Sequence, residues 1–284
     1  MSDLYYVEPE NQAGLNSSRV ALVGDEARRL VKVMRKKEGD EIEVFDGRGL
    51  GARARVASIA RDRVELDVLE RILDDKEPDF ALTALVALPK GDRQKWAIEK
   101  LTELGVRCFI PLAAERADVK FDADVRRRLE RQALEASKQC GRLRVMEIAS
   151  AVSTRELAPL VEILDRRLAT QPRELSRDAA ALAERLAPYA TFDEFQPGDD
   201  VLRVVAHPIS DGYFGQISFG TLARGLADRV PRGALLLIGP IGGFADDEVR
   251  DAVDGGWTPL DLGKQVYRVE TAAIAAAALF LHLA

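Results

Sequence analysis

The chain has 284 residues, 47% of them hydrophobic, and a formal net charge of −6. This length is enough for two domains with separate cores, and the acidic balance excludes a generic polyanion binder while allowing local basic patches. Its two cysteines, Cys108 and Cys140, exclude a disulfide framework, and its two histidines, His207 and His282, argue against a conventional zinc site, so no metal is expected.

Residues 1–75 are predicted to form a small β domain of the barrel type. Apolar and polar residues alternate in its short segments, as they do in strands with one buried face. One amphipathic helix is predicted from about Asp25 to Arg35. Residues 71–80 are polar and contain a proline, which is typical of a linker. The strands are predicted over residues 41–45, 53–59 and 64–69.

The predicted helix carries a cluster of basic side chains within an otherwise acidic domain. Contact with nucleic-acid phosphates is one interpretation of this cluster, since such contacts dominate the affinity of proteins for nucleic acids. A solvated helix face balanced by neighbouring carboxylates is the other, and the residues alone do not decide between them. The cluster comprises Arg28, Arg29, Lys32, Arg35, Lys36 and Lys37.

Residues 76–284 are predicted to form an α/β domain, because strands and helices alternate along the chain. Helices are expected over 92–104, capped by Asp92 and ended by Gly105, and over 124–140, ended by Gly141. This alternation predicts a mostly parallel sheet with ligands bound outside the carboxyl ends of its strands. The strands are predicted over residues 81–88, 106–112, 201–207, 234–239 and 258–263, and residues 170–200 are interpreted as an insertion of helix and loop.

A glycine-rich turn follows one of these strands. Leu235–Ile238 is an unbroken aliphatic run, which is typical of a strand buried on both faces. Gly239, Gly242 and Gly243 permit either a tight bend or the close approach of a ligand. The acidic residues 246–248 then begin a helix, where they would repel a phosphate. The turn is therefore not predicted to be a mononucleotide phosphate loop.

A second glycine-bearing strand end lies at Leu262-Gly263. It leads through an irregular segment into an alanine-rich helix that Glu270 or Thr271 begins, and such a helix typically packs against a sheet or a second subunit. The apolar run 272–281 is too short to span a bilayer, and the first thirty residues lack an apolar signal core. We therefore expect a cytoplasmic protein without a membrane segment.

Four blocks of the second domain stand out: LPKGDRQKWAIEKLTELGVRCFIPLAAER (88–116), EASKQCGR (135–142), LLIGPIGGF (236–244) and LGKQVYRVETA (262–272). The first domain adds RRLVKVMR (28–35) and VFDGRG (44–49). In their order and spacing, these blocks resemble the ribosomal RNA small subunit methyltransferase E family. The resemblance implies a PUA-like β-barrel domain at residues 1–75, a SPOUT α/β domain at 76–284 with a trefoil knot within about 200–284, and a homodimer.

The resemblance also implies an activity. The family transfers a methyl group from S-adenosylmethionine to N3 of a uridine in 16S ribosomal RNA, so small-subunit ribosomal RNA or the assembled small subunit is the expected partner. Backbone groups of the glycine-bearing strand ends would hold the cofactor. The matching residues are Ile238, Gly239, Gly243, Leu262, Gly263, Val266, Arg268 and Thr271, with His207 and Pro208 at the neighbouring strand end.

The resemblance assigns Arg268 a catalytic role. Uridine N3 carries a proton, and an arginine beside the ring oxygen would stabilise the negative charge that develops when this proton leaves. The alternative is an ion pair between Arg268 and Glu270 or a carboxylate at a helix start, and no residue is marked as the general base. The residues implied to contact RNA are Lys90, Arg116, Gln139 and Arg142, besides Arg28, Arg29 and Arg35, and the alternative for each is a surface or helix-end charge.

The sequence departs from the family pattern in several places. Ile241 stands where the family usually has glutamate, and Val269 where it has threonine. Because Ile241 places an apolar group in the predicted cofactor loop, a non-catalytic RNA-binding or ribosome-assembly protein on the same fold is the competing hypothesis. A nucleotide hydrolase is opposed by the absence of a phosphate-loop lysine.

Overall fold

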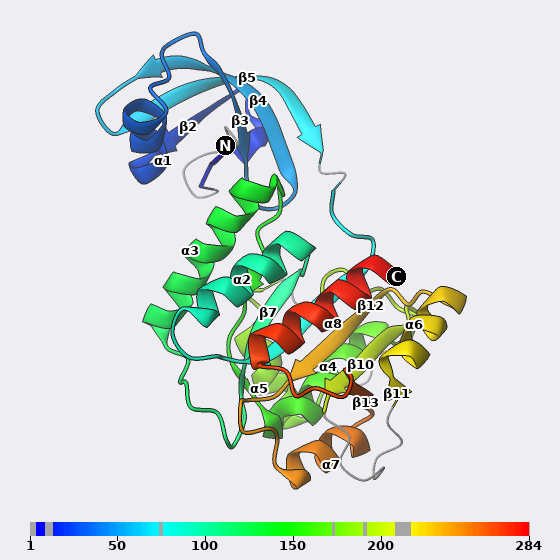
Figure 1. Ribbon diagram of the computed structural model, residues 1–284. Helices are drawn as coiled ribbons and strands as arrows, with labels where there is room; N and C mark the ends of the chain where they lie inside the picture. Colours follow the sequence, from blue (N-terminus) through cyan, green and yellow to red (C-terminus); the bar gives the residue numbers. More distant parts are fainter. Residues whose placement is uncertain are drawn as a thin grey trace. The chain divides into compact units, whose positions relative to one another are not determined.

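A computed structural model describes residues 4–8, 14–73, 76–171, 174–189, 192–207 and 217–283 (Figure 1). The chain folds into two compact units. The first contains Met1–Glu77 together with Leu134–Val145, and the second contains Pro78–Ala133 together with Met146–Ala284. The units are therefore not consecutive in the sequence.

The first unit contains a five-stranded sheet with the order β1-β3-β4-β5-β2. β1 pairs with β3 in parallel, and the other neighbouring strands are antiparallel. One face buries aliphatic side chains, among them Ile42, Val44 and Val56. The predicted β character of this part of the chain is confirmed. The strands are β1 (Leu4–Tyr6), β2 (Arg19–Val23), β3 (Glu41–Phe45), β4 (Leu50–Ile59) and β5 (Arg63–Leu73).

β5 is longer than predicted and includes the beginning of the predicted linker, 71–80. Its pairing with β4 continues as far as Leu73, which stands opposite Leu50. The side chains at this end of β5 are exposed, so the segment is polar although its backbone belongs to the sheet. The linker prediction is wrong for residues 71–73. β1 and β2 were not predicted, because β1 is very short and the apolar residues of β2 do not alternate with polar ones.

The helix predicted over 25–35 changes its winding part-way. α1 (Gly24–Arg28) continues into a π-helical turn, η3 (Arg29–Val33). Arg35 follows in the left-handed region, with a φ of 55°. Arg35 therefore lies beyond the helix, whereas the sequence pattern predicts it within the helix. The pattern does not indicate this end, because a left-handed residue at a helix end is usually recognised as a glycine.

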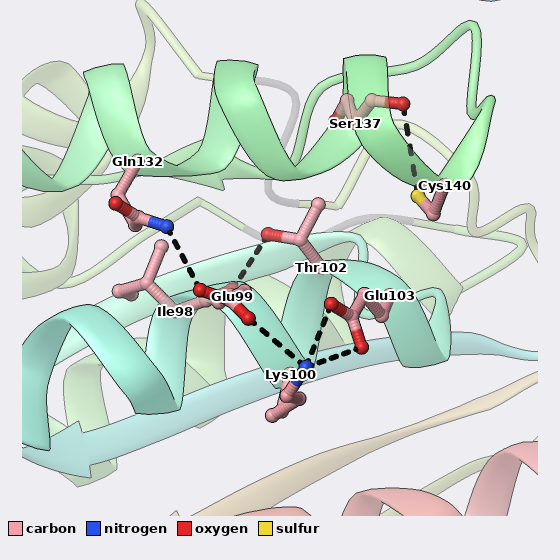
Figure 2. Close-up of polar contacts among 8 residues, drawn as sticks. All are labelled: Ile98, Glu99, Lys100, Thr102, Glu103, Gln132, Ser137 and Cys140. Atoms are coloured by element: carbon pink, nitrogen blue, oxygen red, sulfur yellow. Dashed lines mark hydrogen bonds and ion pairs between the residues drawn. The ribbon is translucent and has the colours of Figure 1, made fainter. Parts of the chain in front are cut away.

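The last turn of α3 (Ala123–Cys140) belongs to the first unit. Its Lys138 is 3% exposed, and the ammonium group contacts Glu26 and Glu135 at N–O distances of 2.7 Å. Gly141 ends the helix with a φ of 78°, as predicted. Figure 2 shows the contact between the Cys140 thiol and the Ser137 carbonyl oxygen in this turn, at 3.7 Å.

The segment after α3 adds a second ion pair and an apolar contact to the first unit. Arg142 donates from Nε and Nη2 to the two carboxylate oxygens of Glu77, at 2.7 and 2.9 Å. Leu143 packs so closely on β4 that a Cβ on Gly51 would lie 2.8 Å from it. The close approach explains why glycine stands at this position of the strand.

The second unit contains a parallel sheet with the order β11-β13-β10-β12-β6-β7-β8, with β9 paired to β7. This confirms the predicted α/β class. Every residue of β6 and β12 is buried, which explains their continuous apolar sequences. The strands are β6 (Ala81–Ala87), β7 (Cys108–Ala113), β8 (Glu147–Ile148), β9 (Val152–Ser153), β10 (Val201–Ala206), β11 (Ile217–Ser218), β12 (Gly233–Ile238) and β13 (Thr258–Asp261).

Helices cover this sheet, and α8 packs on α2 and against β6 and β12 (Figure 1). The alanines of α8 are mostly buried there, as expected for a packing helix. The helices are α2 (Arg93–Leu104), α4 (Leu157–Leu168), α5 (Arg177–Leu186), α6 (Phe219–Asp228), α7 (Asp246–Asp254) and α8 (Val269–Leu283), with short 3-10 turns η2 (Gly14–Asn16) and η4 (Thr154–Glu156).

α2 ends at Gly105, as predicted, with a φ of 103°. Asp92 precedes its first turn, but within the described part of the chain its side chain accepts no capping hydrogen bond. The predicted cap is wrong, because the backbone of Asp92 is already helical (φ −62°, ψ −16°), whereas a capping residue is extended.

Polar contacts line the side of α2 shown in Figure 2. Lys100 lies between Glu99 and Glu103, with Nζ–O distances of 3.0 and 2.8 Å. Gln132 of α3 donates to Glu99 at 3.3 Å. These contacts connect α2 with the part of α3 that belongs to the second unit.

The segment 170–200, interpreted as an insertion, contains α5 and contributes to the core of the second unit. Leu182, Leu186 and Phe195 are buried in the same hydrophobic cluster as Leu235 and Leu237 of β12. The segment therefore helps to bury one face of the sheet.

The trefoil knot within about 200–284 stays a prediction, because strand order and pairing do not determine how a chain threads. No helix among the described residues combines the length and the apolar run that crossing a bilayer requires.

We expect Glu77→Ala to lower the free energy of unfolding of the first unit by about 3 kcal/mol, because Arg142 would stay buried without its carboxylate. Hydrogen exchange of the β4 and β5 amides in rising urea measures this value. The matched control is Glu70→Ala, which removes an exposed ion pair with Arg53 and should cost less than about 1 kcal/mol. Equal effects of the two substitutions would contradict the analysis.

Candidate functional site

The candidate site lies where neighbouring parallel strands end at one edge of the second unit's sheet. β10 lies between β12 and β13. Ala206 at its end stands opposite Ile238 of β12 and Leu260 of β13. The segments that follow these strands therefore start side by side, at the edge where parallel α/β sheets bind ligands.

These segments line a pocket with about 650 Å³ of space between its walls, part of it open to solvent. Aliphatic side chains and glycine backbone form most of the walls, and no lysine or arginine is among the lining residues that the structure describes. The pocket therefore suits a flat, uncharged ring better than a polyphosphate.

The pocket brings together most of the residues predicted to bind the cofactor. Arg268 and Thr271 are exposed and do not line it, although Tyr267 and Val269 do. Pro208 lies outside the described residues. The cofactor contacts themselves stay predictions. The predicted residues that line the pocket are His207, Ile238, Gly239, Gly243, Leu262, Gly263 and Val266.

The glycines between β12 and α7 have conformational and packing reasons of their own. Gly243 has a φ of 71°, and its N–H donates to the Pro240 carbonyl oxygen at 2.9 Å, which closes a turn. A Cβ on Gly239 would lie 2.8 Å from the buried ring of Phe244. The tight bend and its packing therefore account for both glycines without a ligand.

The same loop is fixed by the buried carboxylate of Glu248, in the first turn of α7. Its Oε2 accepts the N–H of Ala245 at 2.9 Å. Its Oε1 accepts the N–H of Glu115 and the hydroxyl of Thr154, both at 2.8 Å. A single carboxylate thus ties the pocket loop to the segments that follow β7 and β9.

Arg116 holds the loop from its exposed side. Its Nη1 donates to the carbonyl oxygens of Gly242 and Phe244, at 3.2 and 3.3 Å. The resemblance implied an RNA contact for Arg116. No local sequence pattern indicates its link to the loop, which joins residues 126 positions apart. Glu248 stands three residues after Ala245, the spacing of a capping box, but the alanine conceals that motif.

His207 lines the pocket, and its surroundings shift the pKa of its imidazole. Burial lowers the pKa of the imidazole from its ordinary value of 6.5, and the nearby charge of Asp246 opposes this shift. The imidazole is therefore neutral at pH 7, and offers one donor and one acceptor nitrogen.

Arg268 does not form the alternative ion pair with Glu270. Glu270 is 5% exposed, and its carboxylate contacts Nε of Arg93 at 3.6 Å. The Arg268 side chain is exposed and makes no ion pair with the residues that the structure describes. The alternative interpretation is wrong, because the first turn of α8 directs Glu270 into the protein.

The predicted RNA contacts of the basic helix lie in the first unit. Arg28 contacts Asp25 and Asp62 at 3.5 and 3.6 Å, as a solvated helix face would. Arg29 lies over the ring of Tyr5, with 5.3 Å from guanidinium to centroid. Arg35 is exposed. Both interpretations of this cluster therefore keep support.

The remaining predicted RNA contacts differ in exposure. Gln139 is exposed at the end of α3, and the exposed Lys90 contacts Asp118 at 2.8 Å. Arg142 is 4% exposed and donates to Glu77. Its guanidinium faces the interior of the first unit, and the RNA contact implied for it stays a prediction.

Comparison with known families decides the assignment. Residues 76–191 and 181–281 match the family model of the RNA methyltransferase domain, and residues 23–69 match that of the RNA methyltransferase PUA domain. The chain belongs to the RNA methyltransferase family. The second match lies within the first unit and confirms the predicted PUA-like domain.

Relatives of this family cover nearly the whole chain. Ribosomal RNA small subunit methyltransferase E of Bacillus subtilis (strain 168) is 28% identical over 94% of this chain and 91% of its own. Protein Lpg2936 of Legionella pneumophila, solved in complex with the bound cofactor SAM, is 25% identical, with a TM-score of 0.71 and coverage of 99% and 97%. Ribosomal RNA small subunit methyltransferase E of Neisseria gonorrhoeae, bound to S-adenosyl methionine, shares the fold at 24% identity, with a TM-score of 0.72 and coverage of 100% and 98%. The resemblance to this family is confirmed.

We expect Glu248→Gln to loosen the pocket loop, because one acceptor oxygen becomes an NH2 group that faces other donors. Loss of a hydrogen bond to a charged group costs about 1.5–3 kcal/mol, so the amides of Glu115 or Ala245 should exchange at least about tenfold faster. Hydrogen exchange measured by NMR gives these rates. Asp247→Asn, an exposed change in the same helical turn, is the control, and unchanged exchange in Glu248→Gln would refute the role.

His207 should make the protein less stable as the pH falls below about 6.5. Because the folded pKa lies below the unfolded one, the unfolded chain binds more protons in the window between them, and stability rises with pH there. We expect His207→Gln to reduce the difference in urea midpoint between about pH 7.5 and about pH 5.5. An unaltered difference would mean that this imidazole titrates alike in both states.

Proposed function

We propose that this chain transfers a methyl group from S-adenosylmethionine to N3 of a uridine in 16S ribosomal RNA. The observation that carries the proposal is the pocket at the aligned ends of β10, β12 and β13, with walls of backbone and aliphatic side chains. Membership of the RNA methyltransferase family supports the reaction type, and the name of the Bacillus subtilis relative supports ribosomal RNA as the substrate. The uridine N3 follows from the resemblance of the sequence motifs.

The pocket residues fit S-adenosylmethionine. An adenine ring needs apolar walls, which Ile238, Leu262 and Val266 supply, and a nucleoside without phosphates needs no cationic cradle. The absence of lysine and arginine from the described lining also suits a sulfonium cation, which like charges would repel. The Legionella pneumophila relative was solved with this cofactor. When bound, the cofactor supplies an activated methyl group.

The contribution of the chain is first one of alignment. Methyl transfer is an in-line displacement, and holding the reactants in line can supply on the order of 7 kcal/mol or more. The contacts of Glu248 and Arg116 fix the loop that would hold one reactant. The rigidity of this loop is therefore part of the proposed mechanism.

Arg268 is proposed to act on the uridine. Removal of the N3 proton places negative charge on the ring oxygens, and a guanidinium beside them lowers the energy of that state. The side chain is exposed next to residues that line the pocket, and no described carboxylate neutralises it. Its charge is thus available to a base that enters the pocket mouth.

The proposed partner is small-subunit ribosomal RNA, either free or in the assembled subunit. The chain as a whole is acidic, so binding would depend on local cations, of which Arg35 and Lys90 are exposed. The PUA-like unit would hold RNA that flanks the target base, which must leave its stack to react. A cytoplasmic homodimer is proposed as the working form, and light scattering tests the oligomeric state.

Calorimetry with S-adenosylmethionine, followed by methyl transfer to unmodified small subunits and to naked 16S ribosomal RNA, tests the function. We expect micromolar binding and one methylated uridine, located by mass spectrometry of nuclease fragments. Cofactor binding without transfer to either substrate would favour the non-catalytic RNA-binding alternative. A methyl group on another atom would preserve the reaction class and refute the N3 assignment.

We expect Arg268→Ala to lower kcat by about 100- to 1,000-fold, the usual loss when one donor to a developing oxyanion is removed. The affinity for S-adenosylmethionine should change little, and Arg268→Lys should restore part of the rate. Arg250→Ala, an exposed change on α7, serves as the matched control. Undiminished turnover in Arg268→Ala would remove this residue from the mechanism.

A further inference from the structure

The segment between β13 and α8 exposes an aromatic ring at the mouth of the pocket. Tyr267 lines the pocket and is 38% exposed, and the preceding Val266 is 81% exposed. Ile241, from the loop between β12 and α7, lines the same pocket and is 57% exposed. Large apolar side chains from two loops thus meet solvent at the place where a substrate would enter.

Two cationic side chains stand close to this ring in the sequence. Lys264 and Arg268 flank it in sequence, and every residue from 263 to 268 is exposed. Of the two carboxylates that bracket the segment, Asp261 lines the pocket and accepts the N–H of Gly263 at 3.0 Å, and Glu270 is buried and contacts Arg93. The arrangement of an aromatic ring between cations is that of a single-strand nucleic-acid contact.

The position of Tyr267 is not explained by packing in the core. Its hydroxyl oxygen lies 4.0 Å from the point where a Cβ would stand on Gly263, so the ring extends back along its own loop. Tyr5, by contrast, is fully buried in the core of the first unit. The ring is therefore accessible to a ligand at the pocket mouth.

We propose that Tyr267 is the stacking platform for the acceptor base, with Ile241 as an apolar contact on the neighbouring loop. A pyrimidine that leaves an RNA helix loses its stacking contacts with the neighbouring bases. An aromatic ring of the protein can replace these stacking contacts, whereas hydrogen bonds cannot. The platform also gives a use to Ile241, the apolar residue that stands where the family usually has glutamate. This inference rests on the proposed function, because it assigns the pocket mouth to the base that is methylated.

Alternative occupants of this surface are a second copy of the chain and the adenine ring of the cofactor. The flanking cations would attract RNA, but they favour RNA over a second copy of this acidic protein only if no copy already covers the surface. The oligomeric state is therefore measured for every variant. The exposure of Tyr267 on the solvent side favours a ligand that arrives from outside over one that lies deeper in the pocket.

Tyr267→Ala, Tyr267→Leu and Tyr267→Phe test the platform. We expect the first two to raise KM for the RNA substrate by about 5- to 150-fold, the range that base–aromatic stacking gives, and Tyr267→Phe to stay within about twofold of the wild type. The dissociation constant for S-adenosylmethionine should stay unchanged in all three. The control is Trp96→Ala, which removes an exposed aromatic ring on α2 that does not line the pocket.

A second measurement does not depend on turnover. A single-stranded RNA oligonucleotide with one 5-iodouridine is irradiated with the full-length protein in the presence of S-adenosylhomocysteine, and the crosslinked peptide is identified by mass spectrometry. We expect the adduct on Tyr267, its loss in Tyr267→Leu and its retention in Trp96→Ala.

Each result separates this inference from the proposed function. Turnover by the wild type with an unchanged KM in Tyr267→Ala, or an adduct elsewhere, overturns the platform and leaves the function standing. An adduct on Tyr267 without turnover makes the ring a general RNA contact, and it overturns both the methyl-transfer function and the assignment of the ring to an acceptor base. Weaker cofactor binding or an altered oligomeric state in Tyr267→Leu assigns the ring to the cofactor or to a second copy, and failure of the wild type to bind RNA overturns both proposals.

Discussion

The common direction of the strands in the second unit is the constraint on which the candidate site depends. When neighbouring strands run parallel and in register, their carboxyl ends reach the same edge, and each chain segment must turn there. Ala206 stands opposite both Ile238 and Leu260, so the turns begin at one level. The backbone therefore determines where the pocket between these turns lies, and the side chains determine its shape and fix its loops.

Buried carboxylates fix the segments around the pocket, and they do not line the pocket themselves. The Glu248 carboxylate accepts three hydrogen bonds from surrounding segments, and the Glu270 carboxylate points inward toward Arg93. The buried carboxylate of Glu248 is stable because both of its oxygens accept hydrogen bonds, and these bonds fix the neighbouring loops relative to one another. The polar side chains that line the pocket include the neutral imidazole of His207 and the carboxylate of Asp261, which accepts the N–H of Gly263.

The sequence was a good guide wherever the relevant physics is local. Continuous aliphatic runs located β6 and β12, and glycines located the ends of α2 and α3 at Gly105 and Gly141. Motif order gave the family, and through it most of the residues that line the pocket.

Local patterns failed where contacts join distant segments or where one residue takes an unusual conformation. The Arg116 contact with the glycine loop and the Arg142 contact with Glu77 leave no periodic trace, so neither contact is predictable from the sequence, and the RNA contacts that the resemblance implies for both arginines stay predictions. Arg35 in a left-handed conformation has no signature such as a glycine would give. The sequence pattern predicts a linker at the end of β5, because solvent exposure makes the side chains of a paired strand as polar as those of a loop.

The path of α3 has a consequence for modularity. Since Leu134–Val145 completes the PUA-like unit, that unit is assembled from two stretches separated by a part of the catalytic fold. A fragment cut after Glu77 would leave a hollow beside Gly51 where Leu143 packs and a carboxylate without Arg142. Recombination or engineering cannot exchange this RNA-binding unit as one continuous cassette, and its evolution is tied to that of the enzyme it serves.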